Sequence, residues 1–303
     1  MPVRAKFMPK LIASLLFVFN LPAIAESESK KSLITAAPVL HTTGVADRLY
    51  RVDCGRSVTH DMSIWTPGQN IGKTAEFSSS CWLVKHAEDW LLWDAGVPDA
   101  SANDPKGWTI SRFNTYYLDK TLAAQLDEIN LTPNDITYLG LSHIHGDHIG
   151  NVKLFPGAKV LMQRAEYEWM NSGDGANTDT DQMKALAREL IGTPKHLMLV
   201  EGDMDIFGDG SVRLISTPGH TPGHQTLLVN LKNTGSIILA GDVAHLARNF
   251  SDNVVPTLNT DKKDSIESMR RIRTLLSEQK ATLFLGHDKT QMSTLKLLPD
   301  AYD

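Results

Sequence analysis

The segment Ser142–His148 constrains this chain more than any other, because four of its seven side chains can bind a metal ion. It follows the apolar run Ile136–Leu141, which has the pattern of a buried strand. A cluster of imidazoles and a carboxylate is typical of a site for a cation such as zinc, whereas a solvated polar loop does not require it. We therefore expect a metal centre at this strand end. The four side chains are His143, His145, Asp147 and His148.

Further candidate ligands stand where other apolar runs end. His220, Asp242 and His287 each follow a glycine, which lets the backbone turn tightly and present the next side chain. With the first cluster they make five histidines and two aspartates, which are too many for one zinc ion with about four ligands. Seven ligands suit two ions that share one carboxylate. The alternation of strands and helices around them predicts two sheets with helices outside and one site along a shared edge.

The first residues of the chain have the pattern of an export signal. Three bases precede a nine-residue apolar run, and small residues in an Ala-x-Ala pattern end at Ala25. We predict a signal peptide over residues 1–25, although an uncleaved anchor is the alternative, and a periplasmic or secreted protein. Residues 26–303 are then expected to form a single domain. No other apolar run has membrane length, so we expect no membrane association after cleavage.

Composition narrows the function further. The formal net charge is −5, and loss of the first 25 residues removes three bases and no acid, which argues against nucleic acid as a partner. Cys54 and Cys81 are the two cysteines, and either a disulfide or two buried thiols fits an exported chain. The segment from Pro98 to Leu118 reads as a long loop. Its aromatic residues either cover a substrate or pack the loop onto the body of the protein; they are Trp108, Phe113, Tyr116 and Tyr117.

The motif His143-x-His145-x-Asp147-His148, followed in order by His220, Asp242 and His287, resembles the metallo-β-lactamase superfamily over nearly all of the mature chain. The resemblance implies an α/β fold, an αββα sandwich of two mixed β-sheets flanked by helices. It implies a first metal bound by His143, His145 and His220. It implies a second metal bound by Asp147, His148 and His287, with Asp242 bridging the two. Zn²⁺ is the expected ion, and Co²⁺, Mn²⁺ or Fe²⁺ also suit these donors. Asp94 matches a family aspartate that orients a ligand from behind.

Within the superfamily, the turn Thr217–His224 and the pair Gly241-Asp242 most resemble the N-acyl-homoserine lactonase branch. An aspartate at position 242, rather than Cys or Ser, argues against the lactam-hydrolysing members. The resemblance implies a hydrolase that opens the lactone ring of an N-acyl-homoserine lactone, a quorum-quenching reaction, through a metal-bridging hydroxide. Asp147 or Asp242 would pass the proton to the departing oxygen. His224 is expected to brace its turn through hydrogen bonds.

One position departs from the branch. Many of its lactonases have a tyrosine three residues after the bridging aspartate, and here that residue is His245. His245 either stabilises an oxyanion or transfers a proton, or it merely lines the pocket. The change keeps a phosphotriesterase or arylesterase with the same metal ligands as an alternative. A non-catalytic, exported metal-binding protein is the alternative from another class, and a homodimer is left open.

Overall fold

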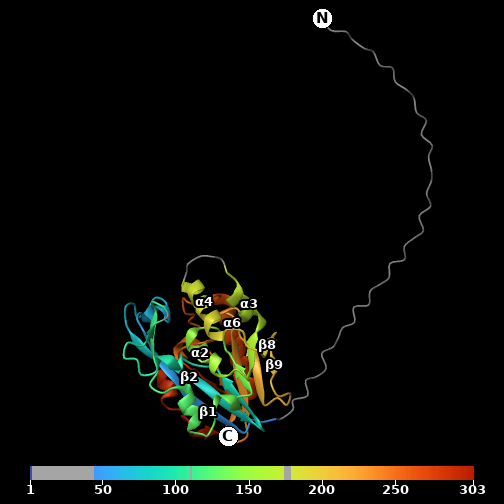
Figure 1. The fold of residues 1–303 in the computed structure, drawn as a ribbon. Coiled ribbons are helices and arrows are strands. Elements are labelled where there is room, and N and C mark those ends of the chain that lie inside the picture. Colours follow the sequence, from blue (N-terminus) through green and yellow to red (C-terminus); the bar gives the residue numbers. More distant parts are fainter. Residues whose placement is uncertain (2–43, 110, 174–178) are drawn as a thin grey trace, which may run out of the picture. The chain divides into compact units, whose positions relative to one another are not determined.

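The computed structural model describes Met1 and residues 44–109, 111–173 and 179–303. Residues 2–25 of the predicted signal peptide and the segment 26–43 therefore lie outside the described residues. The chain from His41 to Asp303 forms one compact unit, with strands at its centre and helices around them (Figure 1). Within the described residues, no helix is long and apolar enough to cross a membrane.

The described strands form two mixed sheets. The larger runs β4-β5-β1-β2-β3-β6-β7-β8, with β14 pairing on one end of β1, and the smaller runs β13-β12-β11-β10-β9. The first sheet consists of β1 (Arg48–Thr59), β2 (Ala75–His86), β3 (Asp89–Trp93), β4 (Trp108–Thr109), β5 (Asn114–Tyr117), β6 (Tyr138–Gly140), β7 (Lys159–Gln163), β8 (Leu197–Val200) and β14 (Ala301–Tyr302). The second consists of β9 (Met204–Asp205), β10 (Val212–Ser216), β11 (Gln225–Leu231), β12 (Gly235–Leu239) and β13 (Thr282–Phe284).

The helices cover the outer faces of these sheets, together with short connecting turns. Asp261 caps the longest one by accepting a hydrogen bond from the backbone N–H of Asp264. The helices are α1 (Leu122–Asp127), α2 (Gly146–Ile149), α3 (Arg164–Asn171), α4 (Asp179–Ile191), α5 (Ala247–Asp252), α6 (Lys262–Gln279) and α7 (Lys289–Met292).

Alternation along the strands builds three apolar layers. On β2, Leu83 faces a core shared with α1 and α4, whereas Trp82 faces the second sheet. Trp82 stacks on Phe284 of β13 with ring centroids 5.3 Å apart. On the far side, Ile238 of β12 packs with Ile272 of α6. The order helix, sheet, sheet, helix confirms the αββα sandwich expected from the resemblance. Each fully buried aliphatic or aromatic side chain contributes about 1.5–3 kcal/mol to it.

Two features of the structure settle or correct expectations from the sequence. Cys54 on β1 and Cys81 on β2 form a disulfide, with their Cα atoms 5.6 Å apart. The predicted loop between Pro98 and Leu118 is wrong in part, because it contains the short strands β4 and β5. β5 extends the sheet by pairing antiparallel with the second half of β1. A two-residue edge strand beside a four-residue strand leaves too little alternation for the sequence to reveal them.

Candidate metal centre

The His143–His148 loop begins just after β6, in the parallel part of the larger sheet. The backbone N–H of Ser142 donates to Asp94 Oδ1 at 2.7 Å, which fixes the start of the loop to the end of β3. The last turn of the loop is α2, where the N–H of His148 donates to the carbonyl of His145 at 3.0 Å. The strand end therefore places the motif at the edge of the sheet that the sequence indicated.

The structure brings together all seven residues that the sequence predicted as ligands. One set contains His143, His145, His220 and Asp242, and a second contains Asp147, His148 and His287. Within each set the candidate donor atoms lie within 4.8 Å of one another. Asp242 also groups with His287, because its Oδ1 lies 3.0 Å from His287 Nε2 while its Oδ2 lies 3.2 Å from His220 Nε2. One carboxylate thus faces both sets.

The imidazole nitrogens of the first set converge on one small space. His145 Nδ1 lies 2.9 Å from His143 Nε2 and 2.8 Å from His220 Nε2. Burial is the main factor that holds the pKa of His143 and His145 well below the ordinary histidine value, so both rings are neutral and offer lone pairs. Three converging nitrogen lone pairs repel one another unless a cation lies between them. This donor set fits a bound metal ion.

The second set carries more negative charge. Burial alone would lower the pKa of His148, but the carboxylates of Asp242, Asp147 and Asp94 raise it to about 10. Burial also lowers the pKa of His287, but the carboxylates of Asp242 and Asp147 raise it to about 9. Two buried carboxylates that draw protons onto neighbouring imidazoles would also attract a divalent cation, so this set fits a metal ion as well.

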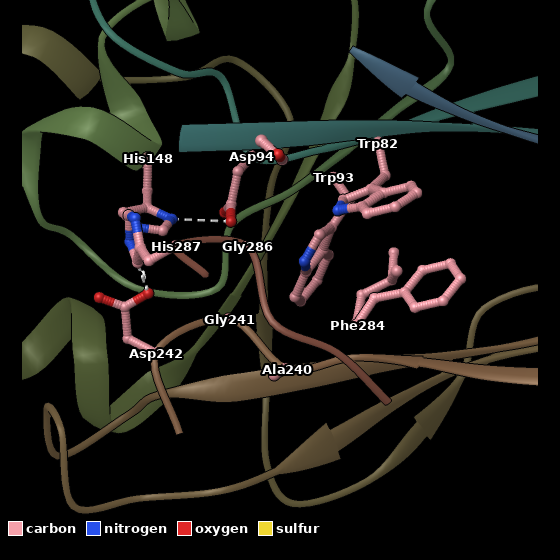
Figure 2. Close-up of a pocket in the computed structure, with 12 residues that line it drawn as sticks. Trp82, Trp93, Asp94, His148, Ala240, Gly241, Asp242, Phe284, Gly286 and His287 are labelled. Atoms are coloured by element: carbon pink, nitrogen blue, oxygen red, sulfur yellow. Dashed lines mark hydrogen bonds and ion pairs between the residues drawn. The ribbon is translucent and has the colours of Figure 1, made fainter. Parts of the chain in front are cut away.

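The outward nitrogens of four of the five ligand histidines are held by hydrogen bonds, which fixes those rings. A proton on Nδ1, donated to a fixed oxygen, leaves Nε2 directed into the site. Figure 2 shows this contact for His148, whose Nδ1 lies 2.8 Å from Asp94 Oδ2. The remaining pairs are His143 Nδ1 with Ser142 Oγ at 2.9 Å, His220 Nδ1 with Asn259 Oδ1 at 3.0 Å, and His287 Nδ1 with the carbonyl of Ser78 at 2.7 Å.

Asp94 holds the loop and one histidine at the same time. Its two oxygens bind the N–H of Ser142 and the ring of His148, as the resemblance implied for a residue behind the ligands. Its φ is 62°, a left-handed conformation that aspartate tolerates better than most residues. Gly96, two residues on, passes the disulfide so closely that a Cβ there would lie 2.7 Å from Cβ of Cys54. The disulfide and Asp94 therefore form one rigid wall of the site.

His224 braces the second half of the site, which confirms the expected role. Its Nε2 accepts a hydrogen bond from the backbone N–H of Asp242 at 2.8 Å, and its Nδ1 lies 3.0 Å from the carbonyl of Thr217. Burial lowers its pKa to about 3, so the ring is neutral and has one donor and one acceptor. His224 therefore positions the backbone of Asp242.

Glu166 also belongs to this site, although no sequence pattern indicates it. Glu166 lies in the first turn of α3 and is fully buried. Its Oε1 accepts from the N–H of Ile144 at 2.9 Å, and its Oε2 accepts from the N–H of Gly223 at 2.9 Å. Burial raises its pKa to about 7. One carboxyl group thus joins the loop of the first motif to the turn that carries His220. A single glutamate at a helix start has no motif that would reveal it.

His245 lies against Asp242 rather than in open space. Its Nε2 is 3.0 Å from Asp242 Oδ2, and its ring is 4.4 Å from that of Trp65. Burial lowers its pKa to about 4, so the ring is neutral. Its Nδ1 is buried and has no hydrogen-bond partner in the described part of the chain. Donation from Nε2 to Asp242, with an unprotonated Nδ1, accounts for both observations.

A cavity of about 120 Å³ opens beside His145 and His220. Phe113 and Tyr116 line it, which fits one of the two interpretations of the aromatic segment; Trp108 instead packs on Tyr116, with ring centroids 5.9 Å apart. The remaining lining combines apolar side chains with polar ones, among them Ser111, Asp179 and Thr180, and comes from distant parts of the chain. We use the term cavity wall for Trp65, Phe113, Asn114, Tyr116, Met183, Leu186 and Leu258.

Comparison with known proteins agrees with this geometry. The family described as the metallo-beta-lactamase superfamily matches residues 74–287. The N-acyl homoserine lactonase AttM of Rhizobium radiobacter is 30% identical over 84% of this chain and 98% of its own length. The N-acyl homoserine lactonase AiiA of Bacillus thuringiensis subsp. kurstaki is 27% identical over the same shares.

Solved structures show the same relationship. An N-acyl homoserine lactone hydrolase with the product N-hexanoyl-L-homoserine bound at its catalytic metal centre aligns with a TM-score of 0.74 and 25% identity. The alignment covers 86% of this chain and all of that one. The fold, the order of the donor residues and these matches agree that the chain belongs to the metallo-beta-lactamase superfamily.

Proposed function

We propose that this protein is a metal-dependent N-acyl-homoserine lactonase, which opens the lactone ring by hydrolysis. The observation that carries the proposal is the convergence of two donor sets on one carboxylate, Asp242, beside a largely apolar cavity. Relatives named as N-acyl homoserine lactonases over nearly their whole length support it, as does the related hydrolase with an acyl-homoserine product at its metal centre. The relatives support the proposed substrate class, and the geometry supports the proposed metal-dependent hydrolysis.

The donor sets suggest two divalent ions. His143, His145 and His220 would hold one ion and Asp147, His148 and His287 the other, with Asp242 between them. Zn²⁺ suits these nitrogen and oxygen donors, and Co²⁺, Mn²⁺ or Fe²⁺ are compatible with them. When bound, such ions would supply a nucleophilic hydroxide from water near neutral pH and polarise the carbonyl of the ester.

The protein's own residues position the substrate and handle the proton. The cavity wall surrounds an acyl chain and directs the lactone toward His145 and His220. Ring opening releases an alkoxide that needs a proton, and Asp147 or Asp242 carries it from the attacking water to the departing oxygen. His245 donates from Nε2 to Asp242 Oδ2 and so keeps that carboxylate turned toward both sets. We assign His245 this orienting role rather than direct contact with the substrate.

We further propose that residues 26–303 act as one exported hydrolase domain in the periplasm or outside the cell. The Cys54–Cys81 disulfide supports an oxidising compartment, because such bonds are rare in reducing cytosol. The signal pattern at residues 1–25 supports the same location.

Titration of released acid in a pH-stat tests the proposed reaction. Wild-type protein, loaded with zinc, is compared on a long-chain N-acyl-homoserine lactone, an aryl ester and an aryl phosphotriester. We expect the lactone to have the highest kcat/KM. His145→Ala should abolish turnover and lose metal, whereas His196→Ala, which changes an exposed histidine, should behave as wild type.

Three outcomes would contradict the proposal. Turnover of the phosphotriester alone would indicate a phosphotriesterase, and turnover of the aryl ester alone would indicate an arylesterase. Metal binding without turnover of any of the three would indicate a metal-binding protein.

A further inference from the structure

The short strand β5 places two polar side chains in the cavity wall. Asn114 and Tyr116 are two residues apart, so they lie on the same face of the strand, and both are buried. Pairing of Thr59 with Asn114 and of Ser57 with Tyr116 fixes β5 on β1. Both side chains line the cavity that also reaches His145 and His220. They are therefore within the space that an acyl lactone would fill.

The hydrogen bonds of this pair leave one acceptor free. Asn114 Nδ2 donates to the hydroxyl oxygen of Tyr116 at 3.3 Å, which orients the carboxamide. The carboxamide oxygen, Asn114 Oδ1, is buried and has no hydrogen-bond partner among the described residues. A buried carbonyl without a donor is costly, so such an atom in a cavity wall indicates that a bound molecule supplies the donor.

The surroundings of Asn114 indicate which donor this is. The cavity that Asn114 lines has apolar side chains from Trp65, Phe113, Met183 and Leu186, and polar ones from Ser111, Asp179 and Thr180. A ligand suited to it has an N–H or O–H for Asn114 Oδ1, apolar groups for the apolar side chains, and an ester that reaches the metal centre. In an N-acyl-homoserine lactone, the amide N–H stands between the ring and the acyl chain.

Resting on the proposed lactonase function, we propose that Asn114 Oδ1 accepts a hydrogen bond from the amide N–H of the substrate. Asn114 then selects N-acylamino lactones over lactones that lack this N–H. A site that pairs with a substrate N–H discriminates against an analogue without it, because the buried acceptor is then left unpaired. Tyr116 is a positioning residue, because its hydroxyl holds the carboxamide in this orientation.

A pair of substrates that differ in one atom tests the proposal. N-hexanoyl-homoserine lactone has the amide N–H, and α-hexanoyloxy-γ-butyrolactone replaces that N–H by oxygen while keeping both carbonyls. Ring opening is followed by mass spectrometry of the intact hydroxy acid, and kcat/KM is measured for both on the zinc-loaded enzyme. The ratio of the two values on one preparation does not depend on how much of a variant is folded.

The variants distinguish the effect of losing the acceptor from the effect of disturbing strand β5. Asn114→Leu removes the acceptor and should lower the amide-to-ester ratio about tenfold relative to wild type. Tyr116→Phe keeps the acceptor but frees the carboxamide, and it should lower the ratio by a smaller factor, about two- to threefold. Thr115→Val is the matched control, because Thr115 faces the other side of β5 and bonds His60, so the ratio should not change.

An unchanged ratio in Asn114→Leu, or an equal fall in Thr115→Val, would overturn the role of Asn114. Wild-type protein that opens neither lactone would instead overturn the proposed function, and the two failures are therefore distinguishable.

Discussion

The donor cluster and the cavity wall lie side by side but are built in different ways. The donor cluster comprises His143, His145, Asp147, His148, His220, Asp242 and His287. Its residues stand in the turns that follow β6, β10, β12 and β13, and nearly all are buried and held from behind by fixed oxygens or backbone groups. The cavity wall is gathered from a turn after β1, the short strand β5, helix α4 and a loop after α5. The difference suggests that the strand ends fix the chemistry, whereas the scattered elements of the wall set substrate selection.

Removal of the carboxylate that both donor sets share should have the largest effect. Asp242→Ala should lower kcat by roughly 10³-fold or more and reduce bound zinc from two equivalents to one or less. Elemental analysis after gel filtration, together with lactone turnover, checks both. If the variant keeps two zinc ions and near wild-type turnover, Asp242 does not link the sets.

The pH dependence of folding stability tests whether Glu166, which joins the two donor loops, has a raised pKa in the folded protein. Its folded-state pKa of about 7 lies above its ordinary value of 4.5, so the folded protein binds this proton more tightly than the unfolded chain. Its contribution to stability is therefore complete below about pH 4.5 and is lost as the pH rises to about 7, on the order of 3 kcal/mol in all.

Glu166→Gln cannot titrate, so its stability relative to wild type should improve between pH 4.5 and pH 8. Urea unfolding with chelator present keeps the metal state equal for both proteins. A stability difference that does not vary with pH would show that Glu166 has the same pKa in the folded and the unfolded protein.

The hydrogen bond behind His148 should affect metal affinity more than folding. Asp94→Asn retains a residue that tolerates the left-handed backbone, but it weakens the acceptor for His148. We expect zinc affinity of the second set to fall about 10- to 100-fold. Competition with a chromogenic chelator measures this affinity. Asp203→Asn serves as the control, because Asp203 pairs with Arg271 and not with a donor residue. Equal affinities for both variants would argue against the assigned role of Asp94.

Changes in the cavity wall should alter selection and leave the metal centre intact. Met183→Ala should lower kcat/KM for a long-chain acyl lactone by about tenfold or less, because the chain loses apolar contact, and should barely affect a short-chain one. Zinc content should stay at the wild-type value. Met198→Ala, at a half-exposed position on β8, is the control. A loss of zinc in Met183→Ala would show that a change in the cavity wall also disturbs the donor cluster.

The same contrast explains what sequence could and could not predict. The seven donors and Asp94 could be located because they follow strong strand patterns and form a dense motif. β5 was missed because it is a four-residue strand within an aromatic segment, and its side chains are placed in the cavity wall only once it pairs with β1. Glu166 was missed because its partners are the backbone N–H groups of Ile144 and Gly223. Almost every residue type has such a group, so the sequence does not mark the partners. For the cysteines, the sequence left thiols and a disulfide equal, and only geometry decided between them.

We propose that two cations, held by the two donor sets and both bound by Asp242, enable this protein to open a lactone ring. The most direct test is to add zinc in steps to metal-free protein while turnover of an N-acyl-homoserine lactone is recorded. We expect little activity before the second equivalent begins to bind and a plateau at two equivalents per chain. A plateau at one equivalent, or binding of two equivalents without ring opening, would contradict it.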